Sequence, residues 1–137
     1  GEGGRKFVDF TTVNRAKVEF SEWVNAQLQR NGLGRRWNAW FQEYPVLLSP
    51  TWTQPPFVFD FDIENEAGAL ATVELMRPVL PANLLGLPAV VVPGGMADSL
   101  PVGVQVIGAR YTDLRCLSIA EQIESACGLD TPIDPIN

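Results

Sequence analysis

The chain has 137 residues, 46% of them hydrophobic, and its ten Lys and Arg against sixteen Asp and Glu give a net charge of −6. A chain of this length can bury a core, so we expect residues 1–137 to form a single domain or a fragment of one. The acidic charge argues against nucleic acid as a partner, and no apolar run reaches the ~20 residues of a membrane span.

The N-terminal half begins with helical patterns. Apolar residues at i, i+3, i+4 and i+7 predict an amphipathic helix over residues 10–30, which the NGLG run is expected to end. A second, shorter helix is predicted from residue 34 or 35 to Tyr44, because Pro45 follows. The PVLLSPT run then predicts a short buried strand, since four apolar residues between prolines are too few for a helix.

The middle of the chain alternates between apolar and charged residues. The run FVFDFDIE, over 57–64, predicts an exposed extended segment or an edge strand with a charged outer face. The following residues are rich in helix formers and predict a helix that ends at Arg77, before Pro78. AVVVP and PVGVQVIG each predict a strand covered on both faces, and the seven residues between them close a hairpin.

The C-terminal region predicts one more helix. Thr112 or Asp113 begins it, Gly128 ends it, and the tail 129–137 is expected to be extended. The spacing of its apolar residues predicts an inner face formed by Leu114, Leu117, Ala120, Ile123 and Cys127.

The absence of histidine is the strongest constraint on the chemistry. It removes Ser-His-Asp and Cys-His nucleophiles and the usual imidazole metal ligands, so a general base must be a carboxylate, Lys6 or Lys17. Lys17 and Ser21 stand four residues apart on the first predicted helix, which suits either a Ser-Lys pair or a solvated lysine. We expect neither a metal ion nor another cofactor.

The two cysteines lie on the last predicted helix, eleven residues apart. That spacing separates Cys116 and Cys127 by about 16 Å, too far for a disulfide. We expect two reduced core thiols rather than a catalytic cysteine, which fits a cytoplasmic protein.

Three other groups of residues have both a structural and a functional interpretation. The alternating carboxylates over 60–66 suit a solvated face or a two-carboxylate hydrolase, whereas an EF-hand is excluded by Asn65 and Ala71 at its sixth and twelfth positions. Trp37 and Trp40 are expected in the core, while Trp52, in a prolyl loop, is the aromatic side chain most suited to a pocket. Three arginines lie where a helix is predicted to end, and interaction with its last carbonyl groups explains them better than an anion site: Arg30, Arg35 and Arg36.

Two spaced motifs resemble a known family. NLLGLPAVVVPGG and LPVGVQVIG resemble the closing part of the amidase signature family, in which an N-x-x-G-x-P strand, a loop and a P-x-G-x-Q-x-x-G strand precede a final helix. YPVLLSPT is similar to the family's D-x-L-L-x-P-T segment, and TTVNRAKVEF to its helix with a central arginine, here Arg15. Taken together and in this order, these segments extend the resemblance over nearly the whole chain. The matching residues of the two closing motifs are Asn83, Gly86, Pro88, Pro93, Pro101, Gly103, Gln105 and Gly108.

The resemblance implies an α/β fold, the C-terminal third of an amidase signature domain, with a mixed β-sheet covered by helices. It implies an enzyme that hydrolyses a carboxylic acid amide to the acid and ammonia or an amine. The family's two catalytic serines belong to a Gly- and Ser-rich run and its lysine base lies upstream of that run; this chain contains neither the run nor a counterpart of the lysine. We therefore expect no catalytic residue here, a triad upstream of Gly1, and the missing N-terminal portion as the partner.

Large apolar residues in loops after predicted strands are the candidates for one wall of the substrate pocket: Trp52, Phe57 and Met96. The expected ligand is a small-molecule amide. A truncated sheet would expose apolar edges, so self-association into a homo-oligomer is also expected. The alternative is a self-standing, non-catalytic binding or assembly module that retains the family's frame.

Overall fold

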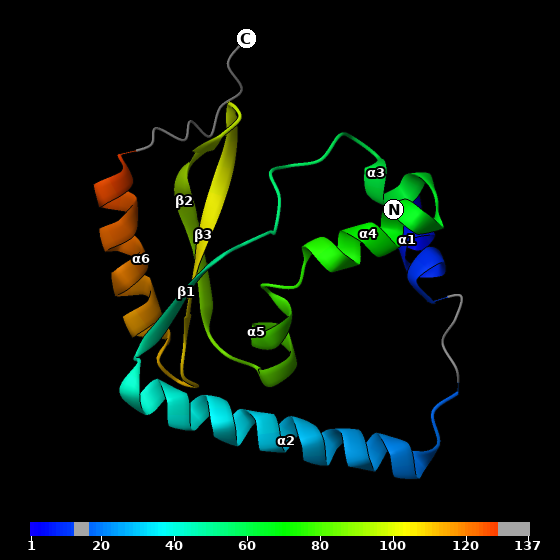
Figure 1. Ribbon diagram of the computed structural model, residues 1–137, viewed down its shortest axis with the longest axis horizontal. Helices are drawn as coiled ribbons and strands as arrows, with labels where there is room; N and C mark the ends of the chain where they lie inside the picture. Colours follow the sequence, from blue (N-terminus) through cyan, green and yellow to red (C-terminus); the bar gives the residue numbers. More distant parts are fainter. Residues whose placement is uncertain (13–16, 129–137) are drawn as a thin grey trace.

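The computed structural model describes residues 1–12 and 17–128, which form six helices and three strands (Figure 1). Arg15 and the predicted tail 129–137 lie outside the described residues. Within the two described ranges, no helix combines the length and the hydropathy needed to cross a membrane. In chain order the elements are α1 (Glu2–Thr12), α2 (Phe20–Glu43), β1 (Val46–Pro50), α3 (Phe61–Glu64), α4 (Glu66–Leu75), α5 (Leu80–Leu85), β2 (Ala89–Ala97), β3 (Leu100–Gly108) and α6 (Asp113–Cys127).

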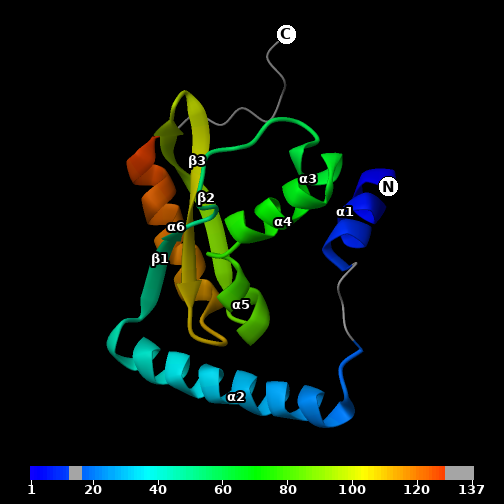
Figure 2. The same cartoon turned by 45° about the vertical axis from the view of Figure 1, so that its right-hand side comes forward.

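The three strands form an antiparallel sheet in the order β1-β3-β2. β1 pairs with β3 from Val46↔Gly108 to Pro50↔Val104, and β2 pairs with β3 from Ala89↔Ile107 to Ala97↔Leu100. Helix α6 lies on one side of the sheet, α4 and α5 lie on the other, and α2 runs along one end (Figures 1 and 2). The predicted α/β class is confirmed, although the described strands are all antiparallel where a mixed sheet was expected.

The core consists of two apolar clusters on opposite faces of β3. Val106 packs with Cys116 and Ala120 of α6, whereas the next residue, Ile107, packs with Phe41 of α2 and Ala82 of α5. Side chains of a strand alternate between the faces of its sheet, so two adjacent residues reach both clusters. Burying side chains of this size contributes roughly 1.5–3 kcal/mol each, which makes β3 the main organiser of the fold.

The predicted break in the first helix is wrong. Helix α2 begins at a capping box between Glu19 and Glu22 and continues through Gly32 and Gly34. Neither glycine has a positive φ, so each costs only about 1 kcal/mol relative to alanine in a helix. Packing of the C-terminal half, where Phe41 is 4% exposed, offsets that cost.

The prediction of an extended segment or edge strand over residues 57–64 is also wrong. Residues 57–60 form an irregular stretch and a turn, Asp60 adopts a left-handed conformation, and α3 follows. The rings of Phe57 and Phe61 lie 5.3 Å apart, which a turn permits and an isolated strand would not favour. The Asn65 side chain then accepts a hydrogen bond from Gly68 N at 3.0 Å and caps α4.

The hairpin is tighter than predicted. Strands β2 and β3 extend to a two-residue loop, Asp98 and Ser99, whose φ angles are 50° and 65°. Two consecutive left-handed residues match the right-handed twist of a hairpin. The start of the NLLGLP run is helical rather than extended, because Gly86 caps α5 with a φ of 65°. Neither strand is covered on both faces along its whole length: Val91 of β2 is 51% exposed, and in β3 the buried residues are 105–108.

Two predictions of buried faces need correction. Strand β1 is only partly buried, with Leu48 53% exposed. In α6 the predicted inner residues Leu114, Leu117 and Cys127 are exposed. The face that packs on the sheet is instead Cys116, Ile119, Ala120 and Ile123, which follows the same i, i+3, i+4, i+7 spacing from a different starting residue.

Candidate functional site

A groove of about 610 Å³ lies beyond the end of β1, where the edge of β3 is free. Its walls are the loop 51–57 that follows β1, residues 101–104 of β3, and Ala97 of β2. None of the described residues that line it carries a charge. The groove therefore suits an uncharged, mainly apolar ligand group, and its volume is within the usual range for small-molecule sites.

The local sequence explains why the edge of β3 is open here. Pairing with β1 ends at Pro50, after which Thr51 N donates one more hydrogen bond to Gly103 O at 3.3 Å. Four prolines line the groove, and proline has no N–H to donate to a ladder. The groove is therefore unsuited to an added strand and would hold a ligand by side-chain contact: its prolines are Pro50, Pro55, Pro56 and Pro101.

Two of the three predicted substrate-binding residues meet in this groove. Trp52 and Phe57 both line it, and their rings are in edge contact with centroids 5.8 Å apart. Met96 is 59% exposed on β2, opposite Pro101, but it is not among the lining residues. Substrate binding by these three side chains stays a prediction.

Thr51 is a lining residue that the sequence does not single out. Its hydroxyl is buried and has no hydrogen-bond partner among the described residues. A Cβ on Gly103 would lie 2.7 Å from Thr51 Oγ1, so glycine is required where β3 and the segment after β1 approach each other. Only the pairing of β1 with β3, over a long sequence separation, brings this hydroxyl to the groove.

The motif residues that carry the family resemblance support the backbone around the groove. Gln105 is 3% exposed, and its Nε2 donates to Ser49 Oγ at 3.1 Å and to Pro78 O at 3.3 Å. It thereby joins β3 to β1 and to the segment after α4. Gly108 lies where β3 meets α6, and its N–H donates to Pro88 O at 3.0 Å. These residues act as scaffold.

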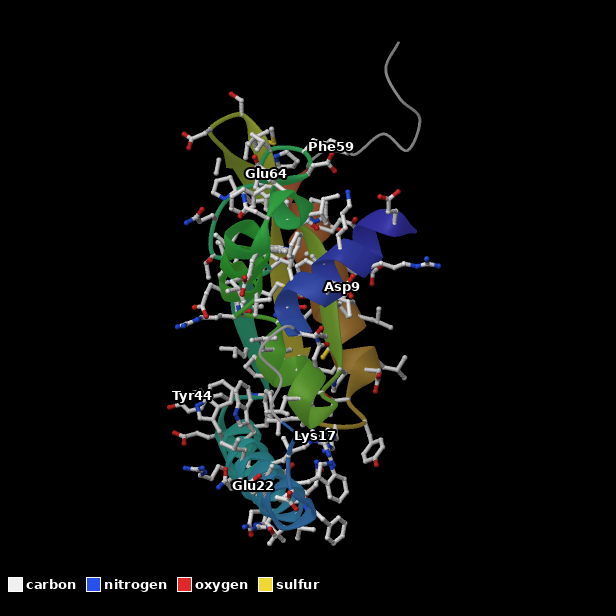
Figure 3. All side chains as sticks on the ribbon, turned by 90° about the vertical axis from the view of Figure 1, so that its right-hand side faces the viewer. Asp9, Lys17, Glu22, Tyr44, Phe59 and Glu64 are labelled. Carbon is white, nitrogen blue, oxygen red and sulfur yellow. The ribbon has the colours of Figure 1, made fainter. Side chains whose placement is uncertain are left out.

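The structure does not assemble the Ser-Lys pair that the spacing suggested. Lys17 precedes α2, whereas Ser21 lies on it, and both are exposed. Lys6 instead pairs with Glu2 of α1 at 3.5 Å. Figure 3 shows Lys17 at the opposite end of the molecule from Glu64, so this lysine is also remote from the acidic segment.

The carboxylates over 60–66 do not form the single alternating face that the sequence pattern implied. Asp60 lies in a turn and Asp62 on α3, so the two are not on one strand. Across residues 1–12 and 17–128, no cluster of three or more His, Cys, Asp or Glu side chains is arranged to hold a metal ion.

The two thiols have different environments, which corrects the prediction that both lie in the core. Cys116 is fully buried against the sheet, and burial raises the pKa of its thiol, whereas Cys127 is exposed. Because the thiolate is the reactive form, we expect Ellman's reagent to titrate Cys127 quickly in the folded protein and Cys116 only after denaturation. Rapid reaction of both thiols under native conditions would contradict the packing of α6.

Comparison with known proteins gives the family. The Amidase family model matches residues 5–117. Indoleacetamide hydrolase from Bradyrhizobium japonicum is 35% identical over 113 residues, which cover 82% of this chain and 24% of that enzyme. Fatty acid amide hydrolase from Medicago truncatula is 36% identical over 111 residues, which cover 79% of this chain and 18% of that enzyme.

The fold agrees with the sequence comparison. A crystal structure of an amidase superposes with a TM-score of 0.68 at 23% identity, covering 81% of this chain and 26% of the amidase. The chain thus spans about a quarter or less of the length of these relatives. With a family match over most of its length and an amidase-like arrangement of helices and strands, the chain belongs to the amidase signature family.

Proposed function

We propose that this chain is the C-terminal part of an enzyme that hydrolyses a carboxylic acid amide to the acid and ammonia or an amine. The family match over residues 5–117 carries the proposal. Residues 1–137 supply scaffold and one wall of the substrate pocket. The nucleophilic serine and its lysine base belong to a segment of the same protein outside this chain, which is its partner in catalysis.

The proposed mechanism assigns the chemical step to the catalytic segment and the positioning of the substrate to this chain. In serine-dependent amide hydrolysis, the serine oxygen attacks the amide carbon, the nitrogen leaves with a proton, and water then cleaves the acyl ester. Fixed hydrogen-bond donors stabilise the oxyanion, and the rate depends on how firmly the substrate is positioned. The groove contributes such positioning through apolar contact.

The chemistry of the groove supports an apolar acyl group as the substrate part that it contacts. The aromatic pair Trp52 and Phe57 offers a flat apolar wall without a charge. Two relatives are named for indoleacetamide and fatty acid amide, whose acyl parts are apolar. We propose that Trp52 and Phe57 contact such a group and that Met96 extends the wall.

Labelling with a fluorophosphonate tests where the nucleophile lies. The 137-residue chain alone should remain unlabelled, whereas the protein that includes the catalytic segment should be labelled at one serine and lose amidase activity. Stoichiometric labelling of the short chain would sink the proposal. If the natural protein proved to consist of this chain alone and to lack amidase activity, a binding or assembly module would replace the enzyme.

Trp52→Ala in the complete enzyme should lower kcat/KM for aromatic or long-chain amides by about tenfold to a hundredfold, because burial of an aromatic ring contributes roughly 1.5–3 kcal/mol. The kcat/KM for acetamide should change little, since its methyl group cannot reach across the groove. Trp23→Ala is the matched control, because Trp23 is an exposed tryptophan on α2 that does not line the groove. Equal losses for large and small amides in Trp52→Ala would instead indicate a folding defect.

A further inference from the structure

A second cavity, of about 330 Å³, lies between α2, the C-terminal end of α5 and the turn between β3 and α6. None of the described residues that line it is an Asp or Glu. Its polar lining consists of Arg30, Asn31, Arg35, Asn38 and Arg110. An adjoining hollow, which shares Arg30 and Arg110 with this cavity, is lined by Asp113, but no ion pair between Asp113 and these guanidinium groups is found among the described residues. In a chain with ten basic and sixteen acidic residues, three guanidinium groups around one cavity without an ion-paired carboxylate need an explanation.

Two of these arginines are fixed by the end of a helix. Arg110 donates from Nε and Nη2 to Leu85 O, at 3.1 and 2.6 Å, and Arg30 Nε donates to Leu84 O. These are the last carbonyl groups of α5. The C-terminal end of a helix is the negative end of its dipole and therefore favours cations. The expected contact with helix-end carbonyls is therefore found for Arg30, but on α5 rather than on the helix that carries it. The guanidinium groups retain further N–H donors.

The third arginine of the cavity, Arg35, differs from Arg30 and Arg110 in that no helix-end carbonyl group fixes its side chain. It lies in the interior of α2, not at a helix end, and no hydrogen bond or ion pair of its side chain is found among the described residues. The ion pairs found among the described residues join Lys6 to Glu2 and Arg77 to Glu74, so neither involves Arg35. Arg35 thus adds a positive charge to a cavity in which two guanidinium groups are already oriented.

We propose that this cavity binds a small oxyanion, of the phosphate or carboxylate type. Guanidinium groups form short, charge-assisted hydrogen bonds with such oxygens, and the side-chain amides of Asn31 and Asn38 can donate as well. The volume is at the lower end of that of small-molecule sites, so the ligand is a small anion or the anionic end of a small molecule.

The site is separate from the proposed substrate groove. The groove contacts residues 101–104 of β3, and the cavity contacts Ala109 and Arg110 just beyond the other end of that strand. At a rise of about 3.3 Å per residue the two are roughly 20 Å apart. Because the bound anion would connect α2 to Arg110 in the β3–α6 turn, its binding should stabilise the folded protein.

Titration of the protein with inorganic phosphate at constant ionic strength, with chloride as the control salt and acetate as the carboxylate probe, tests the site. We expect saturable binding by calorimetry and a rise in Tm with phosphate, acetate or both, but not with chloride. Arg35→Gln should weaken this binding about tenfold, the loss of one charged hydrogen bond. Arg110→Gln is a poorer test, because it also removes the bonds to α5.

Arg36→Gln is the matched control, since Arg36 is the next residue of α2 and lines a different hollow beside Trp37 and Trp40. It makes the same change in net charge and should leave anion binding unchanged. Equal weakening in both variants, or binding that follows ionic strength alone, would show general attraction and overturn the proposal. The absence of saturable binding of both phosphate and acetate would overturn it as well.

Discussion

Gly108→Ala is expected to lower the free energy of unfolding by about 3 kcal/mol, because it overfills the junction between β3 and α6. A Cβ at this position would lie 2.5 Å from Cys116 Sγ and 2.6 Å from Thr112 Oγ1. Neither neighbour can move easily: Cys116 is fully buried, and the Thr112 hydroxyl donates to Ala109 O at 2.7 Å. Relief of the clash would require α6 to shift away from the sheet.

Urea unfolding followed by circular dichroism measures this change. Gly34→Ala provides the matched control, because nothing lies within 4 Å of a Cβ at Gly34 and the residue is in the interior of α2. That variant should be more stable than the parent by up to about 1 kcal/mol, from helix propensity alone. An unchanged urea midpoint for Gly108→Ala would mean that α6 does not pack on β3 as described.

The sequence predicted elements well where local signals and tertiary packing agree. The last helix was predicted to begin at Thr112 or Asp113 and to end at Gly128, and α6 has these limits because Gly128 adopts the left-handed cap, with a φ of 58°. The β2–β3 hairpin was also predicted, since two valine-rich runs separated by turn residues have few other ways to bury their side chains.

Prediction failed where a local pattern had no partner to enforce it. The alternation over 57–64 is typical of a strand, but no neighbouring strand pairs with these residues within the described chain, and contacts between Phe57 and Phe61 favour a turn and a short helix. In α2 the glycines suggested a break, whereas packing of Phe41 maintains the helix. Both outcomes depend on contacts that are distant in sequence.

The apolar groove and the arginine cavity also differ in whether their residues are close together in the sequence. Trp52 and Phe57 lie in one short loop of the groove, and the position of this loop after a predicted strand was enough to suggest a pocket wall. The arginine cavity joins Arg30 and Arg35 of α2 to Arg110, after β3. No sequence pattern links residues so far apart, and only the packing of α5 between their elements brings them together.

Gln105→Glu should lower the free energy of unfolding by about 3 kcal/mol or more near neutral pH, because it places an unpaired carboxylate at a site that is 3% exposed. The change removes the Nε2 donor to Ser49 Oγ and Pro78 O, and turns a negative charge toward the Pro78 carbonyl oxygen. Burial would raise the folded-state pKa of the new carboxyl group above its unfolded value of about 4.3. Differences in urea-unfolding free energy between variant and parent, measured from about pH 5.5 to about pH 8, test this expectation.

The sign of the pH dependence separates this mechanism from a simple packing defect. Below the unfolded pKa the carboxyl group is protonated in both states, so the cost of charge burial is absent. The deficit grows as the pH rises from the unfolded pKa to the higher folded-state pKa, and it is constant above the folded-state pKa. The isosteric change Gln122→Glu is the control, because Gln122 is exposed on α6 and should shift stability by no more than about 0.5 kcal/mol. A deficit in Gln105→Glu that is the same at every pH would show that the carboxylate reaches water, and that Gln105 does not occupy the buried position that joins β3 to β1.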